Sequence, residues 1–161
     1  FPTATIPSFV LLSRMYSQIG LIIPIIGIFI AYGYPPDVYY LQFLYYIPTM
    51  LIFFIVLSWT LGSLAVISRD FENLVKSSLQ AILWLTPILW NIENVSSPTL
   101  QMVLKLNPIY YFIQGYRNIF LYKKWFFDGL YTLYIWFVII VLAIIGSMVY
   151  KRLYKEFADV L

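Results

Sequence analysis

The stretch FLYYIPTMLIFFIVLSWTLGSLAVI, residues 43–67, contains no charged residue and is rich in aliphatic and aromatic side chains. A transmembrane helix needs about 20 mostly apolar residues to cross a hydrocarbon core of about 30 Å. Other apolar stretches lie at residues 9–33, with Arg14 near its start, and at residues 129–150, and a shorter uncharged one lies at residues 77–92. The sequence therefore predicts an all-α, polytopic integral membrane protein with four visible spans, at about 9–33, 43–67, 72–92 and 129–150.

The composition supports a membrane protein and excludes several kinds of chemistry. Of the 161 residues, 62% are hydrophobic and 11% charged, whereas soluble domains have roughly 45–50% and about 25%. The sequence has no cysteine and no histidine, which excludes thiol nucleophiles, imidazole bases and zinc fingers. The net charge of +3 comes from scattered basic residues. That pattern argues against a nucleic-acid partner.

The distribution of lysine and arginine predicts the orientation in the membrane. Arg69 and Lys76 lie in the connection between the second and third spans, and residues 34–42 contain neither residue type. Further basic residues follow the last span, at Lys151, Arg152 and Lys155. We therefore expect both ends, including the tail 151–161, on the cytoplasmic side. Four basic residues on the outer side oppose this assignment: Lys105, Arg117, Lys123 and Lys124.

Prolines lie inside three of the predicted spans, at Pro24, Pro48 and Pro87. A proline within a helix removes one hydrogen bond and frees a carbonyl, which hydrocarbon cannot satisfy. Helices kinked in this way line a path or move. The span that contains Pro87 is short and has Trp84 and Trp90 on either side, so the alternative there is an aromatic anchor at the membrane interface.

Two short helices are expected between the third and fourth spans, at 97–106 and 108–122. Ser97 followed by Pro98 predicts the first helix start. In the second helix one face is apolar, and the other gathers Tyr110, Tyr111, Gln114, Arg117 and Asn118. Such a helix is too short to cross the bilayer, so it is interfacial or re-entrant. It is either an anchor, or it caps an exit path where tyrosines meet sugar rings and Arg117 meets phosphate.

Nothing in the sequence predicts that this chain binds a nucleotide or catalyses a reaction. The glycines form neither GxxxxGK[ST] nor GxGxxG, so ATP hydrolysis by this chain is excluded. All Asp and Glu residues fall at ends of spans or in loops, which disfavours an ion-coupled transporter. The turn SRDFENLVK is either a topology anchor or the place where a separate ATPase acts. The start FPTATIPSF lacks the basic region of a signal peptide, and we expect the sequence to begin within a longer protein.

Five short motifs occur in an order similar to one known family. They are FP with Pro7, SRDFENLV, LTPILW, NPIYYFIQGYRNIFLY and FADVL. Together they resemble the permease subunits of ABC-2 type (type V exporter-like) transporters that export cell-envelope polysaccharides. The runs YRNIFLYKKWF and KRLYKEFADVL are most similar to wall teichoic acid permeases. O-antigen and capsule permeases are close relatives.

The resemblance implies a single ABC-2 transmembrane domain over 1–161, holding the third to sixth of six spans. It implies a plasma-membrane homodimer with two copies of an ATP-binding subunit, which binds ATP and Mg, and no cofactor in this chain. The substrate would be a lipid-linked anionic polysaccharide. Residues expected near its path are Trp84, Trp90, Tyr110, Tyr111, Gln114 and Arg117, and Arg69 and Asp70 are expected to contact the ATPase. An ion channel or a membrane scaffold is the alternative from another class.

Overall fold

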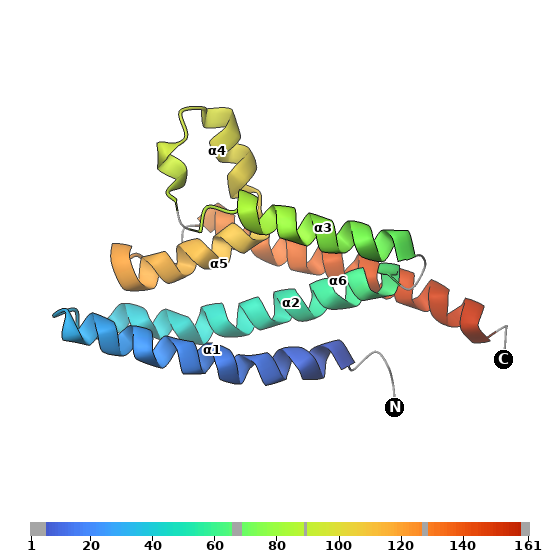
Figure 1. Ribbon diagram of the computed structural model, residues 1–161, viewed down its shortest axis with the longest axis horizontal. Helices are drawn as coiled ribbons and strands as arrows, with labels where there is room; N and C mark the ends of the chain where they lie inside the picture. The colour runs from blue at the N-terminus through green and yellow to red at the C-terminus, as the bar shows by residue number, and fades with distance from the viewer. Residues whose placement is uncertain (1–5, 66–68, 89, 127–128, 159–161) are drawn as a thin grey trace.

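The computed structural model describes the backbone of residues 6–65, 69–88, 90–126 and 129–158, and their side chains except at 6–8, 65, 69, 83 and 152–158. All regular structure within these ranges is helical (Figure 1), which confirms the all-α prediction. The α-helices are α1 (Ile6–Ala31), α2 (Phe43–Ala65), α3 (Arg69–Leu85), α4 (Pro98–Lys105), α5 (Pro108–Arg117) and α6 (Gly129–Ala158). Shorter helical turns are η2 (Val38–Gln42), η3 (Ile92–Asn94) and the π-helix η4 (Asn118–Tyr122).

Three stretches within the described helices are long and apolar enough to cross a membrane: Phe9–Ala31, Val38–Leu64 and Gly129–Lys151. They correspond to three of the four predicted spans. Pro24 and Pro48 lie inside α1 and α2, as predicted. The start of α1, the end of α2, the start of α3 and the far end of α6 lie at the same end of the molecule (Figure 1).

The third predicted span differs from the helix in the structure. The helix was expected to continue to Ile92 with Pro87 inside it, but α3 ends at Leu85. Thr86 N still donates to Ile82 O (2.9 Å), and Ile88 N then donates to Thr86 O (2.8 Å), which turns the chain. Proline disfavours a helical conformation in the residue before it and cannot donate a hydrogen bond. Pro87 therefore ends α3 rather than kinking it. The 17 residues of α3 span about 25 Å, and a full crossing by this segment stays a prediction.

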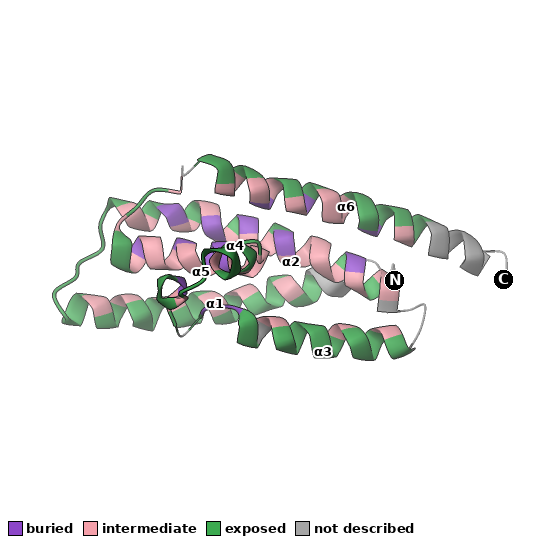
Figure 2. Ribbon diagram, turned by 90° about the horizontal axis from the view of Figure 1, so that it is seen from above, coloured by how far each residue is buried: buried purple, intermediate pink, exposed green. Residues whose placement is uncertain are grey.

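The core forms where α2, α5 and α6 meet. Figure 2 shows buried residues concentrated on these helices, whereas α1 and α3 are mostly exposed. The buried apolar cluster contains Tyr46, Phe53, Tyr111, Phe112, Ile119, Ile135 and Ile139. Farther along, Thr60 Oγ1 donates to Leu142 O (3.0 Å) and lies beside Gly146, so α2 and α6 approach closely there. Small residues permit such close packing of membrane helices.

A chain of partly buried hydrogen bonds joins the same three helices. Tyr45 Oη lies 3.2 Å from Tyr111 Oη, which lies 3.2 Å from Thr132 Oγ1. Trp136 Nε1 donates to Tyr45 Oη (3.1 Å). Unsatisfied polar groups are costly where water is absent. These contacts therefore fix the position of α5 against α2 and α6 as well as satisfying four polar side chains.

The two short outer helices begin as predicted. Ser97 Oγ accepts from Leu100 N at the start of α4, and Asn107 Oδ1 accepts from Ile109 N at the start of α5. Each cap is followed by a proline at the first helical position, a preferred arrangement. α5 runs along the bundle beside α2, while α4 stands away from it on the side of α3 (Figure 1). The predicted helix 108–122 is therefore α5 continued by η4.

Gly115 allows α5 to lie directly against the ring of Tyr46. A Cβ atom at this position would be only 2.7 Å from Tyr46 Cδ1, well inside van der Waals contact. Gly115→Ala should therefore lower the free energy of unfolding by about 1–3 kcal/mol, as other overpacked cores do. Gly62→Ala is the matched control, since nothing lies within 4 Å of a Cβ there. Thermal unfolding in detergent should show a lower midpoint for Gly115→Ala alone, and equal midpoints for the two variants would contradict this packing.

Candidate functional site

A stripe of polar side chains runs along the exposed face of α3. Asp70, Asn73, Ser77 and Gln80 recur at helical spacing, and all are exposed. Trp84 continues the stripe and is 81% exposed. The opposite face carries residues that are partly buried: Phe71, Val75 and Ile82. Polar side chains at membrane depth face water or protein rather than lipid, so this stripe is a candidate lining for a hydrated path.

Sequence analysis identified Trp84 and Asp70 but not the three polar residues between them. The missed residues are Asn73, which was placed in the turn SRDFENLVK, and Ser77 and Gln80, which were treated as part of an uncharged span. Their spacing of three and four residues places them on one face of a helix. The same periodicity that revealed the amphipathic character of α5 would have revealed this stripe.

Arg117 holds the segment that follows α3. Its Nη2 donates to the carbonyl oxygens of Pro87 (3.0 Å), Ile88 (2.9 Å) and Trp90 (3.1 Å). We call these three bonds the Arg117 clamp. Hydrogen bonds from a charged donor are stronger than neutral ones, and the carbonyls belong to a segment without regular helical bonding. The clamp therefore fixes the irregular segment onto α5.

A second bond ties α5 to the end of α3. Asn107 Nδ2 donates to Thr86 Oγ1 (2.7 Å), while Thr86 Oγ1 donates to Ile82 O (2.6 Å) within the last turn of α3. Thr86 and Pro87 are both fully buried. α5 is thus attached to the segment after α3 near its first residue, by Asn107, and at its last, by Arg117.

The other predicted path residues are less exposed than Trp84. Tyr110 and Tyr111 each expose only 4% of their surface. Tyr110 Oη donates to Gln114 Oε1 (3.2 Å), and Tyr111 belongs to the core. The two tyrosine rings are therefore covered in this conformation. Their contact with a substrate stays a prediction.

The predicted contacts to an ATPase lie at the other end of α3. Asp70 is exposed in the first turn of the helix, and the side chain of Arg69 lies outside the described residues. Lys76 Nζ and Glu72 Oε1 form an ion pair (2.6 Å) one turn farther along. The terminal part of the tail, 159–161, also lies outside the described residues. Contact between this end and another subunit stays a prediction.

The two faces of α5 line two different hollows, which confirms the predicted amphipathic division. The apolar face borders a groove of about 400 Å³ between α1, α2 and α5. The polar face borders a smaller pocket of about 130 Å³ with Tyr111, Gln114 and Asn118 in its wall. Arg117 was assigned to the polar face, yet its long side chain lies at the edge of the apolar groove.

An ion pair fastens the end of η4 to the loop between α1 and α2. Lys123 Nζ lies 2.8 Å from Asp37 Oδ2 and 5.2 Å from the centre of the Tyr40 ring. Lys123 has a left-handed backbone (φ 52°) where the chain leaves η4. The hydrogen bond from Lys123 lowers the pKa of Asp37, and a bond from Tyr39 N has the same effect. Among the residues described, no group of three potential metal-binding side chains occurs.

The fold and the site define a helical protein with several apolar helices long enough to cross a membrane and one polar-striped helix, whose end is tied to a short amphipathic helix. The sequence profile of the family described as ABC-2 type transporter matches residues 1–121. The chain therefore belongs to the ABC-2 type transporter family, whose membrane components are permeases that normally work with an ATP-binding subunit. A search of curated proteins finds no match.

Replacing Arg117 by lysine tests the clamp while keeping the charge. Lysine lacks the planar fork and reaches fewer acceptors in a fixed geometry. We expect faster amide hydrogen exchange in residues 88–94 of Arg117→Lys, with unchanged exchange in the core of α2. Lys105→Arg, at an exposed position on α4, is the control. Exchange in 88–94 that matches the wild type would show that the clamp does not order this segment.

The Asp37–Lys123 pair should respond to acid. The folded-state pKa of Asp37 is below its ordinary value of 3.8, so the pair stabilises the fold above that value and the effect is lost as the pH falls through the folded pKa. We expect residues 34–40 to become more accessible to an acid-stable protease between pH 5 and pH 2. Asp37→Asn should show this accessibility already at pH 5. Equal, pH-independent cleavage of both proteins would contradict the assignment.

Proposed function

We propose that the chain is the permease subunit of an ATP-driven exporter that moves lipid-linked wall teichoic acid outward across the plasma membrane. Family membership supports a permease with an ATP-binding partner. The observation that carries the export path is the polar stripe on α3, which ends beside the segment held by Arg117. The polymer is inferred from the motifs that resemble teichoic acid permeases and from the basic residues near the outer end.

In this proposal two copies of the chain place their α3 stripes toward a shared hydrated path. Asn73, Ser77 and Gln80 offer hydrogen bonds without fixed charge. Such a lining suits an anionic polymer that must bind weakly and leave. ATP and Mg are bound by the partner subunits. The movements of those subunits act on this chain at Arg69 and Asp70, at the other end of α3. The chain itself carries out no catalytic step.

The helices α4 and α5 form a hairpin that we call the outer hairpin. It acts as the exit gate. α4 and α5 are joined to the end of α3 by the Arg117 clamp and by the Asn107–Thr86 bond, so a movement of α3 is transmitted to them. Release of the clamp would free a guanidinium, whose geometry suits a phosphodiester. Opening would also uncover Tyr110 and Tyr111 for contact with sugar rings. The chain is thus coupled from the ATPase end of α3 to its exit end.

An O-antigen or capsular polysaccharide exporter of the same family is the second candidate, since the same path and gate would serve it. The charge of the polymer separates the two. Lys105, Lys123 and Lys124 lie at or near the outer hairpin, in line with a substrate that carries phosphate along its whole length. A neutral glycan would not be attracted by these positive charges.

Single-cysteine variants test the path, because the sequence contains no cysteine of its own. The complex of Ser77→Cys with its ATPase would be reconstituted in vesicles that contain fluorescent lipid-linked teichoic acid precursor. A bulky, charged maleimide should label position 77 and reduce ATP-dependent export to background. Leu79→Cys, on another face of α3, is the matched control and should keep its export.

Three results would contradict the proposal, each at a different point. If no ATPase associates with the chain, the chain is not part of an ATP-driven exporter. If export continues after complete labelling of position 77, the polymer does not pass along α3. If a neutral glycan precursor is transported and the teichoic acid precursor is not, the proposed substrate is wrong but the path along α3 still holds.

A further inference from the structure

The groove beside α5 is apolar and lies beside the first half of α2. Its volume of about 400 Å³ is within the range of ligand pockets, roughly 300–1,000 Å³. Met50 and Phe54 in its wall lie about 10 and 16 Å along α2 from Phe43. A hydrocarbon core is about 30 Å thick. With α2 crossing the bilayer from about Phe43, as predicted, the groove lies in the half of the hydrocarbon core nearer the start of α2.

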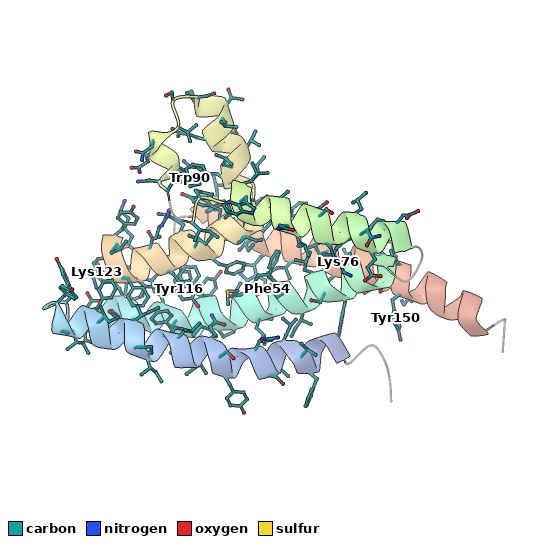
Figure 3. All side chains as sticks on the ribbon, in the orientation of Figure 1. Phe54, Lys76, Trp90, Tyr116, Lys123 and Tyr150 are labelled. Atoms are coloured by element: carbon teal, nitrogen blue, oxygen red, sulfur yellow. The ribbon has the colours of Figure 1, made fainter. Side chains whose placement is uncertain are left out.

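The walls of the groove come from α1, α2, α5 and η4, with Ile88 from the segment after α3. α1 contributes Phe29, and α5 contributes Phe112, Ile113 and Tyr116. Figure 3 shows Tyr116 and Phe54 in the space between α5 and α2. Gln18 of α1 also bonds to Tyr116, with Nε2 donating to Oη (2.5 Å). This bond joins α1 to a residue of the groove wall.

Arg117 places a positive charge at the edge of this apolar groove. No carboxylate lies within 4.0 Å of its guanidinium among the described residues. Nη2 binds the three clamp carbonyls, whereas Nη1 is buried without a hydrogen-bond partner. Carbonyl dipoles do not neutralise the charge, and an unpaired charge near hydrocarbon is costly. The groove is therefore complementary to a ligand with one long apolar part and one anionic group.

We propose that the groove holds an acyl chain of an anionic phospholipid, whose phosphate pairs with Arg117. A phospholipid supplies the two required parts at the correct separation, since its phosphate lies at the interface directly above its acyl chains. A small shift of the Arg117 side chain brings Nη1 to the phosphate while Nη2 keeps the clamp. The bound lipid then fills the space between α1, α2 and α5. The site lies away from the polar stripe of α3 and shares only Arg117 with the proposed exit gate, so lipid binding can be measured without the exported substrate.

Lipid retention by the purified full-length complex tests the site without any transport measurement. The complex would be equilibrated with mixed vesicles of phosphatidylglycerol and phosphatidylcholine, purified in mild detergent, and its lipids quantified per chain by mass spectrometry. Wild type should retain phosphatidylglycerol in preference to phosphatidylcholine. Ile113→Trp fills the groove and should abolish retention of both lipids. Arg117→Gln should reduce phosphatidylglycerol retention about tenfold, the effect of losing one charge-assisted hydrogen bond, and leave phosphatidylcholine unchanged.

Phe137→Trp is the matched control, because Phe137 is exposed on α6 and is absent from the groove wall. It should retain lipid like the wild type. If Ile113→Trp does not fold, Met50→Trp fills the groove from α2 and takes its place. Unchanged retention in the filled groove, or equal loss in Phe137→Trp, would overturn the proposal. Cross-linking of Ile113→Cys to another polypeptide segment would also overturn it, because a helix would then occupy the groove.

Discussion

The carbonyl groups of Pro87, Ile88 and Trp90 accept hydrogen bonds from a single guanidinium nitrogen, Arg117 Nη2. The chain leaves α3 at Leu85, and an irregular segment near hydrocarbon must satisfy its carbonyls from elsewhere in the protein. Arg117 supplies those bonds from the last residue of α5. The attachment of α5 to the segment after α3 depends on this interaction, and Arg117 also lies in the wall of the groove beside α5.

The clamp also connects the two parts of the molecule that bear on transport. The polar stripe of α3 is exposed along its length, whereas the polar face of α5 is packed into the core through Tyr111 and its hydrogen bonds to Tyr45 and Thr132. In the proposed function, a path along the α3 stripe would therefore meet a covered hairpin of α4 and α5. Movement of this hairpin needs a change in the bonds of Arg117 and Asn107, so these two side chains would couple the path to the gate.

Much of the fold could be predicted from local sequence signals. Uncharged runs predicted the long helices, the Ser-Pro and Asn-Pro pairs predicted the starts of α4 and α5, and periodicity divided α5 into two faces. The end of α3 could not be predicted, because Pro87 either kinks or ends a helix according to whether its neighbours' carbonyls find other partners. Here that partner is Arg117, about thirty positions away in sequence. The burial of Tyr111 could not be predicted either, because its hydroxyl group lies against Tyr45 and Thr132, which only the tertiary structure brings near. The spacing of Asn73, Ser77 and Gln80 was sufficient to predict a polar stripe on one face of α3, but this prediction was not made.

The coupling of the hairpin to α3 is tested most directly by a reversible cross-link at the Asn107–Thr86 contact. Cysteines at these two positions, joined by a short disulfide-forming reagent, would hold the start of α5 against the end of α3 in the reconstituted exporter. The account predicts that cross-linking stops ATP-dependent polymer export and that a reductant restores it, while ATP hydrolysis continues. Export at the full rate with the cross-link complete would contradict a gate at this position.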